Sequence, residues 1–413
     1  MFDRTLSPRV AEALLDTPVV LLLGARQVGK STLAKALLAH QAQGRYLTLD
    51  DPAVRRAAEV DPVGFVAQQR GLTVLDEIQL APQLFRTIKA EVDAERKPGR
   101  FLLTGSANVL VLPQVSESLA GRMEVITLDG LSQYEVAGSG GNLVDRLFSD
   151  RPLEPQNLDL DREALIGAIL AGGFPEARER EPGRRRSQWF ESYVQTLLQR
   201  DIRDLSRIEG LTQLPRILEL LSVRSASLLN MAELSRSLGI PLNTLKRYLA
   251  LLEAVFLLAT VPAWSSNLGK RLVKAPKLML RDTGLLAHMM GADAGRLARD
   301  PDLLGGPLET FVAGELRKLL GWAECRARLF HYRTLPGAEV DLLLEHADGR
   351  VLGVEVKASG ALQAKDFRGL KGLAGSLGEA FHGGIVLYTG REVLPFGPKL
   401  HAVPVSALWQ GLA

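Results

Sequence analysis

The segment from residue 24 to residue 31 is the feature that constrains this chain most. It reads Gly-Ala-Arg-Gln-Val-Gly-Lys-Ser and fits the pattern G-x-x-x-x-G-K-[ST] of a phosphate-binding loop. An apolar run, residues 19–23, precedes it, and a helix-compatible run, residues 32–38, follows it. A strand, a glycine-rich turn and a helix in this order bring backbone N–H groups and the positive end of the helix to one point. The segment therefore predicts a binding site for a nucleoside triphosphate.

The residue types of this loop suit phosphate binding. Gly24 and Gly29 permit a tight turn that brings the backbone close to the phosphates. The Lys30 ammonium can reach the β- and γ-phosphates, and the Ser31 hydroxyl can bind Mg²⁺. Thr32, the next residue of the expected helix, completes the candidate nucleotide-binding set. The expected cofactors are therefore a nucleoside triphosphate and Mg²⁺.

The length and charge of the chain limit its organisation. At 413 residues it exceeds the usual size of one hydrophobic core, so two or three domains are expected. Its 50 lysines and arginines nearly balance 47 aspartates and glutamates, so any nucleic-acid binding depends on local patches of charge. Cys325 is the single cysteine, which excludes an internal disulfide and a cysteine-built zinc site and suits a reducing cytoplasm.

No membrane or export segment is expected. The first residues lead directly into mixed polar sequence without the features of a signal segment. The longest apolar stretch, residues 248–264, is interrupted by Glu253 and Pro262 and is too short to span a bilayer. We therefore expect a cytoplasmic location and no membrane partner.

Five apolar runs in the N-terminal third have the lengths and spacing of parallel strands. They cover residues 19–23, 46–49, 72–75, 101–103 and 125–128. Helix-compatible segments separate them, which predicts a parallel α/β sheet with its ligand at the carboxyl ends of the strands. Asp76 and Glu77 directly follow the third run. Asp76 is expected to orient Mg²⁺, and Glu77 to take a proton from the attacking water.

Two further positions of this domain are candidates, and each has an ordinary alternative. The fourth run ends in residues 104–108, where Thr104 could sense the nucleotide or orient water; a plain polar loop explains the same residues. Arg122 could stabilise charge on the phosphates, supplied within one chain or by a neighbouring copy. Surface arginines are common, so Arg122 also suits an ordinary surface position.

The N-terminal third resembles an AAA-type ATPase of the bacterial and archaeal kind whose loop reads GxRQ-x-GK-[ST]. The resemblance also includes residues 75–79 (LDEIQ), 103–106 (LTGS), 120–122 (AGR) and 131–135 (LSQYE). It implies that the nucleotide is ATP. It also implies a second, poorly characterised domain in the C-terminal half. We therefore expect a P-loop ATPase domain over residues 1–135.

The middle of the chain reads as a linker followed by a helical region. Residues 136–160 contain glycines, prolines and scattered acids, which is typical of an inter-domain connection. Residues 161–300 are expected to be helical and winged-helix-like. Within them, residues 231–249 have helix-turn-helix form, with a capping residue at Asn243 or Thr244. This module either packs domains together or binds duplex DNA through a second helix that carries Lys246, Arg247 and Tyr248.

The C-terminal part, residues 301–413, contains a predicted hairpin with charged residues on one face. Its strands are residues 339–344 and 351–357, joined by a turn with Asp-Gly at its tip. Alternation puts Glu355 and Lys357 on the same face, and Asp341 can lie beside Glu355 on the neighbouring strand. These carboxylates could hold Mg²⁺ and polarise a water for phosphodiester hydrolysis. Upstream, Glu309 and Glu315 are alternative third acids on a helix starting near residue 306.

This arrangement resembles the core of the PD-(D/E)xK nuclease superfamily. Asp341, Glu355 and Lys357 match its motif position by position, while the upstream acid is open between Glu309 and Glu315. The resemblance implies a nuclease-like α/β fold, whereas cleavage has to be argued from the site itself. An amphipathic hairpin with charges on its wet face has the same pattern. His331, on the preceding strand, could contact a substrate or simply pack.

The sequence as a whole predicts an Mg²⁺-dependent ATPase that acts on nucleic acid through a nuclease-like C-terminal domain. In this hypothesis Glu77 serves ATP hydrolysis, while Asp341, Glu355, Lys357 and Glu309 serve cleavage. The expected partners are ATP, DNA or RNA, and further copies of the chain. The alternative is a nucleotide-switched binding or assembly module whose nuclease-like domain only docks a partner.

Overall fold

The computed structural model describes residues 2–40, 43–107, 119–137, 139–202, 211–334 and 337–412. Contacts between Cα atoms divide the chain into two compact units, which we describe separately. The first unit comprises Met1–Gly130 and Ala250–Leu257, and the second comprises Leu131–Leu249 and Leu258–Ala413. Among the described residues, no helix is both long enough and apolar enough to cross a membrane.

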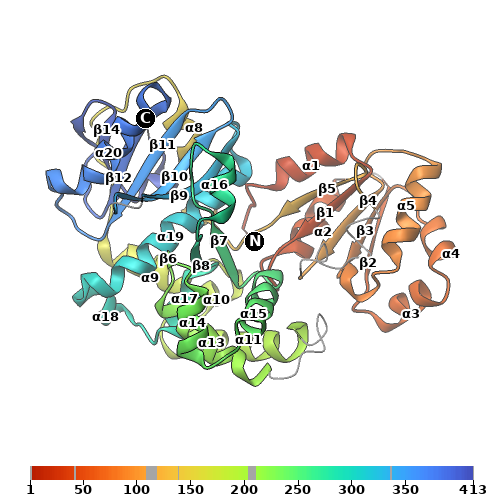
Figure 1. Ribbon diagram of the computed structural model, residues 1–413. Helices are drawn as coiled ribbons and strands as arrows, with labels where there is room; N and C mark the ends of the chain where they lie inside the picture. The colour runs from red at the N-terminus through yellow and green to blue at the C-terminus, as the bar shows by residue number, and fades with distance from the viewer. Residues whose placement is uncertain are drawn as a thin grey trace. The chain divides into compact units, whose positions relative to one another are not determined.

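The first unit is built on a parallel sheet of five strands in the order β2-β3-β4-β1-β5 (Figure 1). The strands are β1 Val19–Leu23, β2 Gly44–Thr48, β3 Leu72–Asp76, β4 Phe101–Gly105 and β5 Met123–Thr127. The helices are α1 Ser7–Asp16, α2 Lys30–Ala39, α3 Pro52–Val60, α4 Pro62–Ala67 and α5 Leu84–Ala94. The prediction of a parallel α/β sheet from the five apolar runs is therefore confirmed.

Burial explains why these runs form strands. Every residue of β1, β3 and β4 is buried, as expected for central strands of a parallel sheet covered on both faces. The strands at the two edges, β2 and β5, are partly exposed. Parallel pairing brings the carboxyl ends of β1, β3 and β4 to one edge of the sheet, where the phosphate-binding loop begins.

The second unit begins with a series of helices and a small antiparallel sheet. The helices are α7 Gln133–Ala137, α8 Leu143–Phe148, α9 Arg162–Ala171, α10 Pro175–Glu179, α11 Arg184–Thr196, α13 Leu214–Val223, α14 Met231–Leu238, α15 Leu242–Ala254, α16 Leu268–Val273, α17 Thr283–Met289 and α18 Ala294–Arg299. The strands are β6 Ser227–Leu228, β7 Leu258–Val261 and β8 Lys277–Leu280. Strand β8 lies between the other two in the order β6-β8-β7.

Helices α14 and α15 occupy the positions predicted for the helix-turn-helix. Asn230 caps α14, and Gly239 ends it in the left-handed conformation. Helix α15 begins at Leu242, one residue before the expected cap at Asn243. Lys246 and Arg247 are exposed, but Tyr248 is buried. The Tyr248 side chain therefore belongs to the core, which favours the packing alternative over the DNA-binding one.

The C-terminal part of the second unit contains a mixed sheet of six strands in the order β13-β14-β12-β11-β10-β9 (Figure 1). The strands are β9 Ala327–Arg333, β10 Glu339–His346, β11 Val351–Lys357, β12 Phe381–Tyr388, β13 Leu394–Gly397 and β14 Leu400–Pro404. The helices are α19 Pro301–Trp322, α20 Arg368–Leu377 and α21 Ala407–Gln410. Helix α19 starts earlier than expected and continues through Pro307, because Asp300 caps it and Pro301 opens its first turn.

Apolar side chains on both faces of this sheet form two cores. One core joins α8, α9 and α19 to the face of the sheet that carries Leu342, Leu344, Leu352 and Val354. The other core joins α20 to the opposite face through Val340, Leu343 and Phe367. Strands β10 and β11 pair antiparallel, with Leu342 opposite Val354. The predicted alternation holds from Leu342 to Leu344, but an irregularity in the pairing of β10 with β9 places Val340 on the same face as Leu343.

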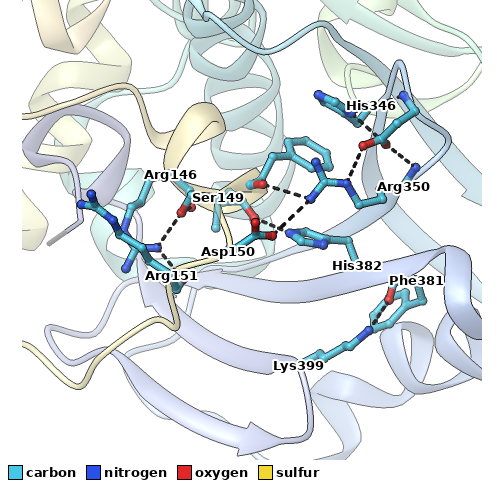
Figure 2. Close-up of polar contacts among 12 residues, drawn as sticks. Arg146, Ser149, Asp150, Arg151, His346, Arg350, Phe381, His382 and Lys399 are labelled. Carbon is cyan, nitrogen blue, oxygen red and sulfur yellow. Dashed lines mark hydrogen bonds and ion pairs between the residues drawn. The ribbon is translucent and has the colours of Figure 1, made fainter.

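The segment predicted as a linker, residues 136–160, belongs to the second unit, and its described residues include helix α8. Its helix α8 buries four apolar residues in the core, Leu143, Val144, Leu147 and Phe148. Arg350 donates to the Phe148 carbonyl oxygen at 3.1 Å, and a ring nitrogen of His382 lies 3.1 Å from the Leu147 carbonyl oxygen (Figure 2). The glycines and prolines around α8 were misleading, because the apolar residues between them bind the segment to the sheet.

Candidate functional site

The phosphate-binding loop leaves β1 and enters α2, as predicted from its sequence. Gly29 has a φ of 99°, a left-handed conformation that glycine adopts without strain. A Cβ atom on Gly24 would collide with the carbonyl oxygen of Leu128 in the neighbouring segment. Both glycines are therefore required by the backbone path, quite apart from any bound phosphate.

Lys30 is buried at the start of α2. Its Nζ donates to the carbonyl oxygens of Gly24 at 3.0 Å and Ala25 at 2.8 Å, so the ammonium lies against the loop that carries it. Thr32, two residues further along α2, is exposed. A buried ammonium with carbonyl partners at the N-terminus of a helix presents positive charge to an anion bound in the loop.

The Asp76 carboxylate accepts hydrogen bonds from three side chains of this site. The Ser31 hydroxyl donates to its two carboxylate oxygens at 2.9 and 3.0 Å, and the Tyr46 hydroxyl donates at 2.6 Å. The Thr104 hydroxyl donates as well. The carboxylate and the Ser31 hydroxyl are hard oxygen donors of the kind that Mg²⁺ takes, so these residues fit the expected metal. Burial and the Asp76 carboxylate raise the pKa of Tyr46, which therefore remains a donor.

Glu77 follows Asp76 in the left-handed conformation, with a φ of 59°. Such a conformation is unusual for a glutamate and turns its side chain away from the strand direction. Its backbone N–H donates to the Thr104 hydroxyl at 3.1 Å, and its carboxylate accepts from the Gln79 amide. The same amide donates to Ser106 at 2.9 Å. The tip of β4 is thus hydrogen-bonded to Asp76 and Glu77. Asn108, the last residue of the predicted tip, lies outside the described residues.

Arg122 lies at the opposite edge of the sheet. It directly precedes β5, and its carbonyl oxygen accepts from Val19 at the start of β1. Its guanidinium binds the Asp93 carboxylate of α5. Five residues of strand separate it from the loop, a rise of about 16 Å. The geometry therefore does not support a role for Arg122 at the phosphates of its own chain, and its action on a neighbouring copy stays a prediction.

Three residues that the sequence analysis did not single out support the nucleotide site. Tyr46 and Gln79 bond to the two acids as described above. Arg4 donates to the carbonyl oxygen of Val28 in the loop at 2.6 Å and to that of Asp129 at 2.7 Å. No sequence pattern near Arg4 indicates this contact, because the partners are 24 and 125 residues away.

The second candidate site lies on the C-terminal sheet. Asp341 of β10 and Glu355 of β11 lie on neighbouring strands, and an Asp341 oxygen accepts from the Val356 N–H at 3.0 Å. Lys357 donates to Glu355 at 3.1 Å. Burial first, and then the Asp341 charge, raises the pKa of Glu355 to about 8. The structure thus brings together the three residues that the hairpin pattern predicted.

Of the two alternative upstream acids, the structure places Glu309 near Asp341 and Glu315 elsewhere. Glu315 is buried elsewhere, where it accepts from the backbone N–H of Gln133 at 2.7 Å and from Lys318. Glu309 instead meets Lys277, which the sequence analysis did not single out. Lys277 Nζ lies 2.8 Å from Glu309, 3.2 Å from Glu339 and 3.5 Å from Asp341. We call Lys277 and its three carboxylate partners, together with Glu355 and Lys357, the carboxylate cluster.

The charges of the carboxylate cluster are strongly coupled. Burial first, and then the Asp341 charge, raises the pKa of Glu309 to about 8 although Lys277 opposes the shift. Burial alone would lower the pKa of Lys277, but Glu309, Asp341 and Glu339 raise it above its ordinary value. Lys277 is therefore a permanent ammonium. His331 is packed rather than free, since it is buried and its ring nitrogen lies 3.1 Å from the Ala275 carbonyl oxygen.

The carboxylate cluster does not fit the expected Mg²⁺ as it stands. An ammonium already lies between Glu309 and Asp341, at the place where their oxygens would have to meet a metal. Within the part of the chain that the structure describes, no group of three or more histidine, cysteine or acidic side chains is arranged to hold a metal ion. The expectation that Asp341 and Glu355 ligate a metal is therefore not supported by this geometry.

Three segments of the chain match known domain families. Residues 16–137 match the AAA domain, residues 162–296 match a domain of unknown function (DUF8612), and residues 304–408 match another (DUF4143). Together with the phosphate-binding loop and the parallel sheet, the first match defines an ATP-binding P-loop ATPase domain of the AAA type. The third agrees with the poorly characterised C-terminal domain that the resemblance implied.

The chain belongs to the family of two curated mycobacterial proteins, the uncharacterized proteins Mb2031c of Mycobacterium bovis and Rv2008c of Mycobacterium tuberculosis. Each is 35% identical over 357 residues, which cover 86% of this chain and 73% of the relative.

Two solved structures are similar at low identity. The Walker-type ATPase PABY2304 of Pyrococcus abyssi has 16% identity and a TM-score of 0.45, covering 70% of this chain and 96% of that chain. The RuvB Holliday junction branch migration motor of Thermotoga maritima has 18% identity and a TM-score of 0.30, covering 63% and 90%. At such TM-scores these likenesses carry no functional conclusion.

Proposed function

We propose that this protein is an Mg²⁺-dependent ATPase. The observation that carries the proposal is the bond between Ser31 of the loop and Asp76 of β3, because a metal-binding hydroxyl and a metal-orienting carboxylate meet beside a buried lysine. The test is release of phosphate from Mg²⁺-ATP by the purified full chain. Hydrolysis that is absent from the wild type under every metal condition would contradict the proposal.

Each residue of the site has a role in this proposal. Lys30 and the loop N–H groups bind the β- and γ-phosphates, and Ser31 and Asp76 hold Mg²⁺, which neutralises charge on the phosphates when bound. Glu77 accepts the proton of the attacking water. Gln79 holds the Glu77 carboxylate and also contacts Ser106, so the tip of β4 and the general base share one hydrogen-bond chain.

Tyr46→Phe is expected to weaken the binding of Mg²⁺ that hydrolysis needs, without unfolding the site. The variant removes one hydroxyl donor to Asp76 but keeps the ring, over which Lys35 lies at 4.5 Å. A hydrogen bond to a charged group contributes about 1.5–3 kcal/mol, so the Mg²⁺ concentration for half-maximal hydrolysis should rise about tenfold. A Mg²⁺ titration of ATP hydrolysis measures it. An unchanged titration would remove Tyr46 from the site.

Arg122 supports a proposal about assembly. It lies at the amino end of β5, away from the phosphate-binding loop, so any action on phosphates would be on a neighbouring copy. A ring or dimer that places this end of the strand beside the next phosphate-binding loop would supply the arginine in trans. We therefore include further copies of this chain among its proposed partners.

The middle of the second unit supports contact with nucleic acid. Elements α13, β6, α14, α15, β7 and β8 follow one another in the order of a winged-helix module, with β8 at the centre of the small sheet. Lys246 and Arg247 are exposed early in α15, where a DNA-binding helix carries its contacts. The buried Tyr248 favours the packing role instead, so DNA or RNA stays a proposed partner of this helix.

For the C-terminal domain, cleavage and docking are both proposals, and the geometry favours docking. Asp341, Glu355, Lys357 and Glu309 converge as a nuclease-like site requires. Lys277, however, neutralises this site from within. A nucleotide-switched module that docks nucleic acid without cutting it accounts for both observations. ATP binding in the first unit would then control the docked state.

We therefore expect no metal-dependent cleavage by the purified wild-type chain. The assay uses single-stranded, duplex and branched DNA and RNA, with Mg²⁺ or Mn²⁺ and with or without ATP, while ATP hydrolysis is followed in parallel. Asp341→Asn and Lys30→Met run beside the wild type. Cleavage that Asp341→Asn abolishes would establish the nuclease, and its further loss in Lys30→Met would show that ATP controls it.

A further inference from the structure

Lys277 differs from Lys357, the other lysine of the carboxylate cluster, in its burial and in its number of partners. Its side chain is 2% exposed, and its ammonium lies within 3.5 Å of carboxylates from two separate elements, Glu309 of α19 and the pair Glu339 and Asp341 of β10. Lys357, in contrast, is 33% exposed and contacts Glu355. The centre of the carboxylate cluster is therefore occupied by a cation that belongs to a third element, β8.

The position of β8 prevents this cation from leaving easily. Lys277 pairs in register with Leu228 of β6 on one side and with Val261 of β7 on the other. A strand bonded on both sides cannot slide without breaking ladder hydrogen bonds. The Lys277 ammonium is thus held beside its carboxylates by the strand. A free metal ion has to compete for these carboxylates with an ammonium that is always present.

The segment between β7 and β8 is also bound to the C-terminal sheet. Arg271 donates to both carboxylate oxygens of Glu345 at 2.7 and 2.6 Å, and the Trp264 indole donates to Glu345 at 2.9 Å. The backbones of Trp264 and His331 are bonded as well. These contacts hold the segment that precedes Lys277 against β9 and β10, so the lysine has no free loop on which to swing out.

We propose that Lys277 is the resident cation of the carboxylate cluster: its ammonium takes the place of a divalent metal, and its removal opens that place to one. The inference deepens the docking proposal for the C-terminal domain and is independent of ATP hydrolysis. Four acids confined on two strands and one helix need compensating positive charge, since an unpaired buried carboxylate is costly. Lys277 supplies that charge from within the chain.

The first test is direct metal binding by the full chain without nucleotide, followed by the electron paramagnetic resonance signal of free Mn²⁺. The wild type is expected to show no Mn²⁺ site that depends on Asp341. Lys277→Met is expected to gain one, with affinity at least about tenfold above that of any residual Mn²⁺ binding by the wild type, because three carboxylates are released. Adding Asp341→Asn to Lys277→Met should abolish the gain. Lys274→Met, an exposed lysine of the same segment, is the matched control.

The second test separates charge from packing. Lys277→Met should lower the thermal midpoint by about 10 °C, because it leaves carboxylates buried without their cation. Adding Asp341→Asn removes one of these charges and keeps the size of the side chain, so the double variant should regain part of the loss. A double variant no more stable than Lys277→Met would show that only packing was lost and would overturn the proposal.

The wild-type titration decides the inference even where a variant does not fold. An Asp341-dependent Mn²⁺ site in the wild type would show that Lys277 does not exclude metal, whether or not any nucleic acid is cut. Lys277→Met with the stability of Lys274→Met and no new Mn²⁺ site would overturn it equally. Neither result would bear on ATP hydrolysis, which is measured separately on the same samples.

Discussion

Replacing Glu77 by glutamine is expected to leave ATP bound while lowering its turnover by about 10²–10⁴-fold, the range usual for loss of a general base. The change keeps the size and shape of the side chain but removes the group that accepts the proton. The left-handed backbone at residue 77 and the Asp76 contacts do not depend on the charge that is lost. Binding of a fluorescent ATP analogue and single-turnover phosphate release measure the two effects separately.

The control for this variant is Glu59→Gln, which makes the same chemical change at an exposed position of α3. It should hydrolyse ATP like the wild type. Hydrolysis by Glu77→Gln at the wild-type rate would remove Glu77 from the role of base. Loss of binding as well as turnover would assign it to nucleotide binding instead.

Replacing Lys30 by methionine should abolish most of the affinity for ATP. The ammonium donates to two loop carbonyls and presents its charge to the phosphates. Hydrogen bonds to charged groups contribute about 1.5–3 kcal/mol each, so losing the phosphate contacts should weaken binding at least about 10²-fold. Methionine preserves the buried aliphatic stem. Isothermal titration with a non-hydrolysable analogue and Mg²⁺ gives the dissociation constant.

The matched control for this second variant is Lys35→Met, in the same helix. Lys35 is exposed and lies over the Tyr46 ring instead of entering the loop. Its replacement should leave ATP affinity within about threefold of the wild type, as is usual for exposed charges. Equal losses in the two variants would mean that general positive charge, and not the buried ammonium, holds the nucleotide.

The first unit could be predicted in detail because its signals are local. The loop, the strand before it and the two acids at the end of β3 each lie in a single short stretch. The five apolar runs predicted the strands of the sheet. Tyr46 and Gln79 escaped prediction for different reasons. Tyr46 reaches Asp76 only because β2 pairs with β3, and Gln79 turns back because of the left-handed backbone at Glu77.

The carboxylate cluster could be predicted only in part from the sequence. Alternation along the hairpin placed Asp341, Glu355 and Lys357 together, since both strands are adjacent in sequence. Lys277 lies 64 residues before Asp341, in a strand of another sheet, and no spacing rule connects them. The choice between Glu309 and Glu315 was open for the same reason. It depended on which turn of α19 faces the sheet, and the early start of this helix was not predicted.

The ion pairs of Lys277 also bear on how this protein can be divided. A cut between residues 300 and 301, at the boundary that the sequence suggests, would leave the lysine in one fragment and Glu309, Glu339 and Asp341 in the other. Each fragment would then contain charged side chains without their partners of opposite charge. The two parts of the second unit are therefore expected to be stable only when they are expressed together, although separate domain families describe them.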